Sequence, residues 1–159
     1  MRARSPRRCA IGARSNERGR KRPGQCRRRP SSGAAVTIAY LALLVAAMLP
    51  FVCAGISKAG RRDYDNRSPR EWMETLHGYR RRADAAQSNS WEALPFFAAA
   101  VIIAHQLGAE QGWLDALAVA FVLLRMVYVW LYVRDRSTLR SVVWTAALAV
   151  NVWIFFLGA

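Results

Sequence analysis

Long apolar blocks alternate with short polar segments along this chain. The apolar blocks cover residues 34–56, 93–104, 113–133 and 142–159. A bilayer core about 30 Å thick is crossed by about 20 helical residues, so the first, third and fourth blocks are each long enough to span it. No segment shows the strict alternation of apolar and polar residues that is typical of strands. The pattern therefore predicts an all-α integral membrane protein.

The second block, residues 93–104, is too short to span a membrane by itself. It becomes long enough if its helix begins near Pro69 and ends near Gly108, because proline suits a first helical turn and glycine a helix end. Such a helix passes the polar residues Asn89 and Glu92 at the membrane edge. One long polar connection and two tight turns then join the helices, which predicts an antiparallel four-helix bundle.

Positive charge is concentrated at the N-terminus. The formal net charge is +14, and 12 of the 24 Lys and Arg residues lie in the first 33 positions, where Glu17 is the only acid. We interpret residues 1–33 as a basic disordered tail and residues 34–159 as the membrane domain. An anionic-lipid arm and a transit peptide are alternatives for the tail. Because aromatic residues and any recognition fold are missing from it, we expect no nucleic-acid partner.

The remaining charges predict the orientation in the membrane. Eight Lys or Arg residues lie in the 58–82 segment and three in the 134–140 segment, so the positive-inside rule places both in the cytoplasm. The basic tail would then have to cross the membrane. An inverted or tail-retained topology removes this conflict. So does translation from a GTG codon at Val36, which would leave residues 1–35 out of the mature protein.

Polar side chains recur on one face of the second helix. Arg82, Asn89 and Glu92 are spaced by seven and three residues, so they share a face. Ala85 and Ala86 lie on the same side, where small residues allow a close helix contact or leave room for a ligand. This face is therefore a candidate binding surface.

The third helix repeats the pattern, with Arg125, Tyr128 and Tyr132 on one face. Arg125 lies eight residues, or about 12 Å, inside the end of its span. A central arginine costs about 2.5–3.5 kcal/mol on insertion, so it should face the bundle interior and pair with an anion. Glu92 is the nearest acid by depth. Arg140, at the start of the fourth helix, adds a cation at the same mouth.

A purely structural interpretation fits the same residues. In it, Glu92 and Arg125 form an ion pair and Asn89 hydrogen-bonds across helices, which fixes the helix register without any chemistry. His105 lies outside the cluster, and Asp115 with Glu110 marks the ends of a solvated turn. The three cysteines show neither a CxxC nor a His-Cys spacing, so we expect free thiols and no metal site.

Two stretches, "RADAAQSNSWEALPFF" and "RMVYVWLYVRDRSTLRS", resemble the MAPEG family, the membrane-associated proteins in eicosanoid and glutathione metabolism. The resemblance covers about residues 36–159 and is strongest to the bacterial branch. The resemblance rests on three motifs: Asn-x-x-Glu on the second helix, Arg-x-x-Tyr-x-x-x-Tyr on the third and Arg-Ser on the fourth. It implies a homotrimer in the bacterial inner membrane, with glutathione bound between neighbouring subunits on the cytoplasmic side.

The resemblance also implies roles for single residues. Asn89 and Glu92 would hold the glutathione backbone, with Glu92 on its amino group, and Arg140 would be the catalytic residue beside the sulfur. A guanidinium there lowers the thiol pKa and raises the thiolate fraction. The same pocket would be lined by Arg82, Arg125, Tyr128 and Tyr132.

The implied function is a glutathione-dependent transferase or peroxidase acting on a lipophilic small molecule drawn from the membrane lipids. One alternative is a non-enzymatic trimer that binds a lipid or small anion in the same cleft. A small proton-coupled transporter is another, although Glu92 lies at the membrane edge and not at the midplane.

This sequence differs from well-studied glutathione-using members on the turn before Asn89. Ala85 and Ser88 stand where those members carry arginines. Lys58, Arg81 and Arg82 are the candidates to supply the missing positive charge.

Overall fold

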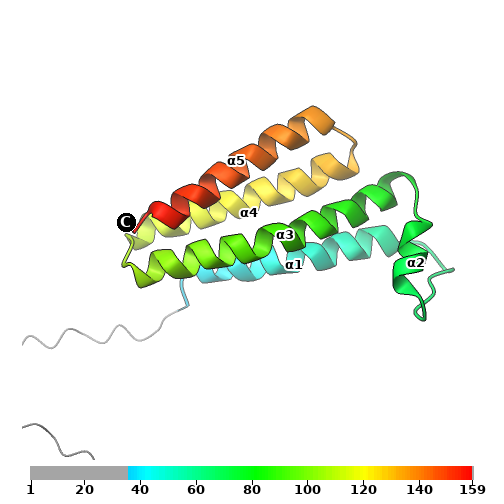
Figure 1. Cartoon of the computed structure of the whole chain (residues 1–159), viewed down its shortest axis with the longest axis horizontal. Coiled ribbons are helices and arrows are strands. Elements are labelled where there is room, and N and C mark those ends of the chain that lie inside the picture. The colour runs from blue at the N-terminus through cyan, green and yellow to red at the C-terminus, as the bar shows by residue number, and fades with distance from the viewer. Residues whose placement is uncertain (1–35, 159) are drawn as a thin grey trace, which may run out of the picture. The chain divides into compact units, whose positions relative to one another are not determined.

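The computed structural model describes residues 36–158 and folds them into helices only (Figure 1). The predictions for residues 1–33 lie outside this range. Three helices, α1, α4 and α5, are long and apolar enough to cross a membrane, as the apolar blocks predicted. The helices are α1 (Ile38–Lys58), α2 (Pro69–Glu74), α3 (Gly78–Gln106), α4 (Gln111–Val133) and α5 (Ser137–Phe156).

The predicted start of the second long helix near Pro69 is wrong. Pro69 opens α2, which ends at Glu74 as a separate short helix. The long helix α3 begins only at Gly78, whose φ is +62°, directly after His77 in extended backbone. A residue in the left-handed region cannot continue a right-handed helix, and glycine adopts that region at little cost. The break therefore separates α2 from the helix that carries the polar face.

The predicted helix end near Gly108 is confirmed. Gly108 has φ +76°, and its N–H donates to the carbonyl of His105 at 3.1 Å. The N–H of Ala109 donates to the carbonyl of Ala104 at 3.0 Å, which completes a Schellman motif. The turn after α4 uses the same pair of bonds around Asp135, a non-glycine residue with φ +62°. Both turns reverse the chain within a few residues.

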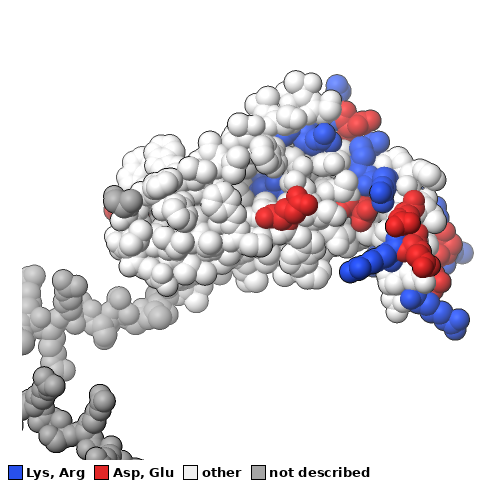
Figure 2. Space-filling view, viewed as in Figure 1, with Lys and Arg blue, Asp and Glu red and all other residues white. Residues whose placement is uncertain are grey.

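The four long helices form an antiparallel bundle in which α3 and α4 each touch the other three, while α1 and α5 share no contact among the described residues. The 59–77 connection and the 134–136 turn lie together at one end (Figure 1), which we call the charged end. Figure 2 shows most Lys, Arg, Asp and Glu atoms of the described part gathered there. The 107–110 turn and the end of α5 lie at the opposite end.

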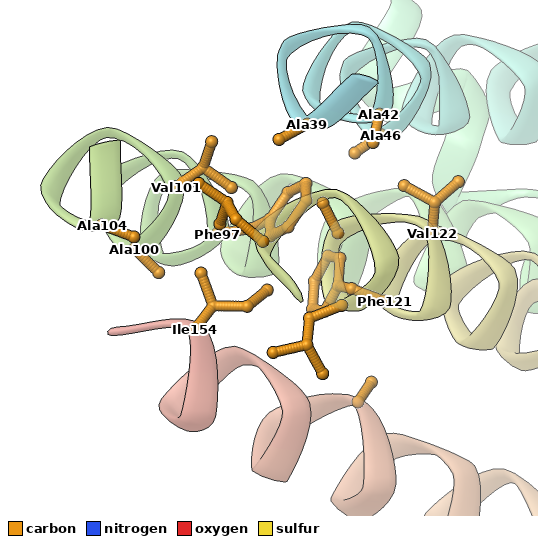
Figure 3. Packing of buried hydrophobic residues seen from close by; sticks show 14 residues of the cluster. Ala39, Ala42, Ala46, Phe97, Ala100, Val101, Ala104, Phe121, Val122 and Ile154 are labelled. Atoms are coloured by element: carbon orange, nitrogen blue, oxygen red, sulfur yellow. The ribbon is translucent and has the colours of Figure 1, made fainter. Parts of the chain in front are cut away.

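Small side chains bring the helices close together toward the opposite end. Ala39, Ala42 and Ala46 of α1 face the aromatic and aliphatic side chains of α3 and α4 (Figure 3). At the centre, the rings of Phe97 and Phe121 stack with their centroids 4.1 Å apart. The outward faces carry exposed apolar side chains such as those at 41, 44 and 123. A bilayer suits such a surface, because the backbone groups in the interior of each helix are already paired within that helix.

Candidate functional site

Arg125 is the centre of a polar network between α3 and α4. Its side chain is only 3% exposed. Its Nη1 donates to Oδ1 of Asn89 at 3.0 Å and its Nη2 donates to Oγ of Ser90 at 3.2 Å. The guanidinium also lies over the ring of Tyr128, 4.5 Å from the ring centre. Arg125 therefore faces the bundle interior, as its depth predicted, and holds α3 against α4.

The predicted ion pair between Glu92 and Arg125 is wrong. The ion pairs of the described residues include neither side chain. At the level of Arg125, α3 presents Asn89 and Ser90, and Glu92 lies nearly one turn further along the helix. Asn89 stands between the two charges, since its Nδ2 donates to Oε2 of Glu92 at 3.4 Å. The interhelical hydrogen bond expected of Asn89 is confirmed, and the exposed carboxylate of Glu92 is left with capacity to accept further hydrogen bonds.

Ser90 is the residue of this network that sequence reasoning missed. It is 4% exposed, and its hydroxyl donates to the carbonyl of Ala86 at 2.8 Å while accepting from Arg125. Adjacent helical residues point about 100° apart, so Ser90 does not share the face of Asn89. A small polar residue inside an apolar helix is the only sequence signal, and it resembles any helical serine bonded to its own backbone.

Two tyrosines connect Arg125 to Arg140. The rings of Tyr128 and Tyr132 meet edge to face with centroids 5.6 Å apart, and the guanidinium of Arg140 lies 4.2 Å from the Tyr132 ring centre. The shared face of Arg125, Tyr128 and Tyr132 is thus confirmed. Within residues 36–158, Arg140 forms no ion pair. Contact with a ring face leaves its N–H donors available to a ligand.

The side chain of Arg82 binds the end of α4. Its Nε and Nη2 both donate to the carbonyl of Val133 at 3.2 Å, and its Nη1 lies 3.6 Å from Oδ2 of Asp135. A cation at a helix C-terminus satisfies a carbonyl that has no partner within the helix. The guanidinium predicted to bind a ligand is therefore engaged with the α4–α5 turn.

A groove of about 380 Å³ opens beside Glu92, and we call it the outer groove. Ala85 and Ser88 keep it open because their side chains are small. Of the three candidates for extra positive charge, only Arg81 lines it. Lys58 is bound to the hydroxyl and ring of Tyr64, and Arg82 is bound to the end of α4. The outer groove is lined by Arg81, Asp84, Ala85, Ser88, Asn89, Glu92, Tyr128 and Tyr132.

A second space of about 170 Å³ lies between α3, α4 and α5, and we call it the inner cavity. Asn89 and Glu92 line both spaces, so the two meet at these side chains. The inner cavity is lined by Asn89, Glu92, Ala93, Phe96, Phe121, Arg125, Trp144, Ala147, Leu148 and Asn151. A polar, open groove thus adjoins a mainly apolar cavity, an arrangement suited to a charged ligand beside a lipophilic one.

The family model of MAPEG matches residues 37–159, which include all four long helices and every candidate site residue. The resemblance seen in the sequence is therefore confirmed at the level of the family. The assignment to the bacterial branch stays a prediction. Neither the search of curated proteins nor the search of solved structures returned a match.

Proposed function

The chain belongs to the MAPEG family of membrane glutathione-dependent enzymes, and we propose that it is a glutathione-dependent transferase or peroxidase acting on lipophilic electrophiles. It is a multi-pass integral membrane protein, with three long apolar helices in the described part. The observation that carries the proposal is the exposed carboxylate of Glu92. It has one long hydrogen bond and stands where a polar groove meets an apolar cavity.

The groups around the outer groove fit glutathione, which carries two carboxylates, one ammonium group and a thiol. Glu92 supplies the anion for the ammonium group. Arg81 lines the groove as the cation for a carboxylate, although its Nη1 also pairs with Oδ2 of Asp84 at 3.3 Å. Asn89 presents an amide to the peptide backbone. The volume of about 380 Å³ lies within the range of about 300–1,000 Å³ usual for small-molecule sites.

Arg140 is the residue we assign to the thiol. Bound glutathione would supply a sulfur nucleophile for an electrophilic carbon or a hydroperoxide, in its thiolate form. A guanidinium beside a thiol lowers the thiol pKa, so Arg140 favours release of the proton to solvent at neutral pH. Among the described residues, Tyr132 holds Arg140 by ring contact alone, which leaves its N–H groups free to face the sulfur. Arg125 plays a positioning part, because it fixes the amide of Asn89.

We also propose that a homotrimer completes this site, with the charged end on the cytoplasmic side. Only 17% of the α5 span is buried within the protomer, against 44% of the α4 span, so α5 has surface to offer to a second copy. Trp91 and Trp144 are each more than 40% exposed, on α3 and α5. A neighbouring subunit would cover the groove and keep water from the thiolate.

Thermal melting of the full-length protein in detergent, with and without millimolar glutathione, tests the proposal. A ligand at 100 times its Kd stabilises the native state by about 2.7 kcal/mol, which gives a readily measured shift. We expect a shift in the wild type that shrinks in Asn89→Ala, Glu92→Gln and Arg140→Ala. Glu71→Gln, an exposed carboxylate of α2, is the matched control and should keep the full shift.

Conjugation of glutathione to an aryl halide and reduction of a lipid hydroperoxide are then assayed on the same samples. If glutathione gives no shift in the wild type while the three variants are merely less stable, the proposal is wrong. A lipid-binding or anion-binding trimer would then explain the site better. The replacement of groove arginines by Ala85 and Ser88 favours that second function.

A further inference from the structure

Asn151 of α5 is a buried amide at the wall of the inner cavity. It is 2% exposed, and its Oδ1 has no hydrogen-bond partner among the described residues. The proposed glutathione site makes no use of it. Buried side-chain amides in proteins are nearly always paired, so an unpaired one on a residue that lines a cavity points to a missing ligand group.

The helix spacing places Asn151 at the inner end of this cavity. The lining positions on α3 are 89, 92, 93 and 96, and those on α5 are 144, 147, 148 and 151. Both sets follow the i, i+3, i+4, i+7 spacing of a single helix face. Both helices also run from the charged end toward the opposite end (Figure 1). Seven residues rise about 10 Å, so the cavity extends about that far from Asn89 before reaching the Asn151 amide.

Apolar side chains form the walls between these two polar ends. Phe96, Phe121, Trp144 and Leu148 are the large apolar residues among them. The volume of about 170 Å³ is close to that of an apolar protein cavity of about 150 Å³ that takes up benzene. One aromatic ring with a short alkyl chain therefore fits.

The chemistry of the amide selects the group at the inner end. Its oxygen needs a donor and its nitrogen needs an acceptor, and a hydroxyl group can serve either one. We propose that the inner cavity binds a hydroxyl-bearing lipophilic electrophile, about the size of an alkylphenol, with its hydroxyl on Asn151. Its other end lies at Asn89 and Glu92, beside the outer groove. This inference rests on the proposed function, because it names the class of lipophilic substrate presented to the glutathione site.

Two probes that differ by one hydroxyl group, 4-propylphenol and propylbenzene, test the assignment on full-length protein in detergent. We expect the wild type to bind the phenol at least tenfold more tightly than its partition into detergent explains. Asn151→Leu, which keeps the number and branching of the side-chain heavy atoms and removes the amide, should abolish that preference. Each probe partitions into detergent equally with either protein. The partition therefore cancels when the ratio of the two probe affinities is compared between the wild type and the variant. Thr145→Val removes a hydroxyl from an exposed position of α5 and should change nothing.

A preference that survives Asn151→Leu overturns the inference, and so does a wild type that binds neither probe. Asn151→Val, which has one side-chain heavy atom fewer than asparagine, replaces the leucine variant if that one does not fold. The glutathione-induced melting shift is measured in the same samples and should persist in both variants. If that shift is missing while the Asn151-dependent preference is present, the proposed function fails and the phenol site stands.

Discussion

The two ends of the bundle use polar side chains in different ways. At the opposite end, Oδ1 of Asp115 accepts from the backbone N–H of Ala39 and from Nε2 of Gln111, both at 2.7 Å. Glu110 accepts from the N–H groups of Gly112 and Trp113 at the start of α4. These carboxylates, interpreted from sequence as ends of a solvated turn, are helix caps: Asp115 joins α1 to α4, and Glu110 caps the start of α4.

His105 completes the network at that end. Its Nε2 lies 3.2 Å from Oγ1 of Thr37, and its Nδ1 lies 2.9 Å from the carbonyl oxygen of Val101. It also stacks on Tyr40 with ring centres 4.4 Å apart. Both ring nitrogens are engaged, which leaves no capacity for a ligand. The placement of His105 outside the candidate site is thereby explained.

At the charged end the hydrogen-bonding capacity is only partly used. Glu92 has one contact of 3.4 Å and Arg140 has a ring contact without an ion pair among the described residues. A polar side chain with all its partners inside the fold stabilises that fold. One that keeps unused donors or acceptors is available to a ligand. This difference distinguishes the two ends, and four predictions test it.

The largest expected effect is on Arg140. In Arg140→Ala the thiol pKa of bound glutathione rises toward its ordinary value, so the rate of conjugation at neutral pH should fall about 100-fold. Because the thiolate fraction grows with pH, the deficit should shrink as pH increases. Rate profiles against pH measure this, with Arg136→Ala in the adjacent turn as the control for loss of one charge. A deficit that is equal at every pH would contradict the assigned role.

Glu92→Gln should weaken glutathione binding by about ten- to a hundredfold, because the ammonium group loses its anionic partner. The melting temperature without ligand should hardly change, since Glu92 is exposed and makes one weak contact. Calorimetric titration and melting curves measure the two quantities. A large loss of stability without ligand would instead make Glu92 a structural residue.

Asp115→Ala should show the reverse pattern. Loss of two 2.7 Å hydrogen bonds, one of them to the backbone of α1, should destabilise the fold by about 1–2 kcal/mol. Glutathione affinity should be unchanged, because Asp115 lies at the opposite end. Equilibrium unfolding in detergent and glutathione titration provide the test. Weakened glutathione binding would mean that the two ends are coupled.

The smallest effect concerns Asp63, an exposed carboxylate of the connection before α2. The hydrogen bond from Arg61 holds its pKa below the ordinary value. Its contribution to stability is therefore present above the unfolded pKa of about 3.9 and is lost as pH falls through the lower folded value. In Arg61→Gln, NMR titration should show the pKa of Asp63 rising. Glutathione affinity should be the same in Arg61→Gln as in the wild type. This variant therefore shows how little the loss of an exposed ion pair outside the site affects binding.

Several features of the fold followed from the sequence because they depend on local chemistry. Block length and hydropathy predicted the spans of α1, α4 and α5, since a helix must hide its backbone from lipid over a fixed thickness. Gly108 marked the end of α3. The break at Gly78 was missed, because nothing in the composition shows that this glycine takes a left-handed backbone while Gly112 does not.

The candidate site was only partly predictable. The sequence by itself determined which residues share a face on each helix, so Arg125, Tyr128 and Tyr132 were grouped correctly. Only the tertiary structure decided which groups the polar side chains meet. Arg125 binds Asn89 and Ser90, and Arg82 binds the end of α4. Asn151 lines the inner cavity with its Oδ1 unpaired among the described residues. The physical reason is that helical periodicity fixes directions within one helix. Contacts between helices depend on the axial shift and rotation of one helix against another, which side-chain packing sets over the whole bundle.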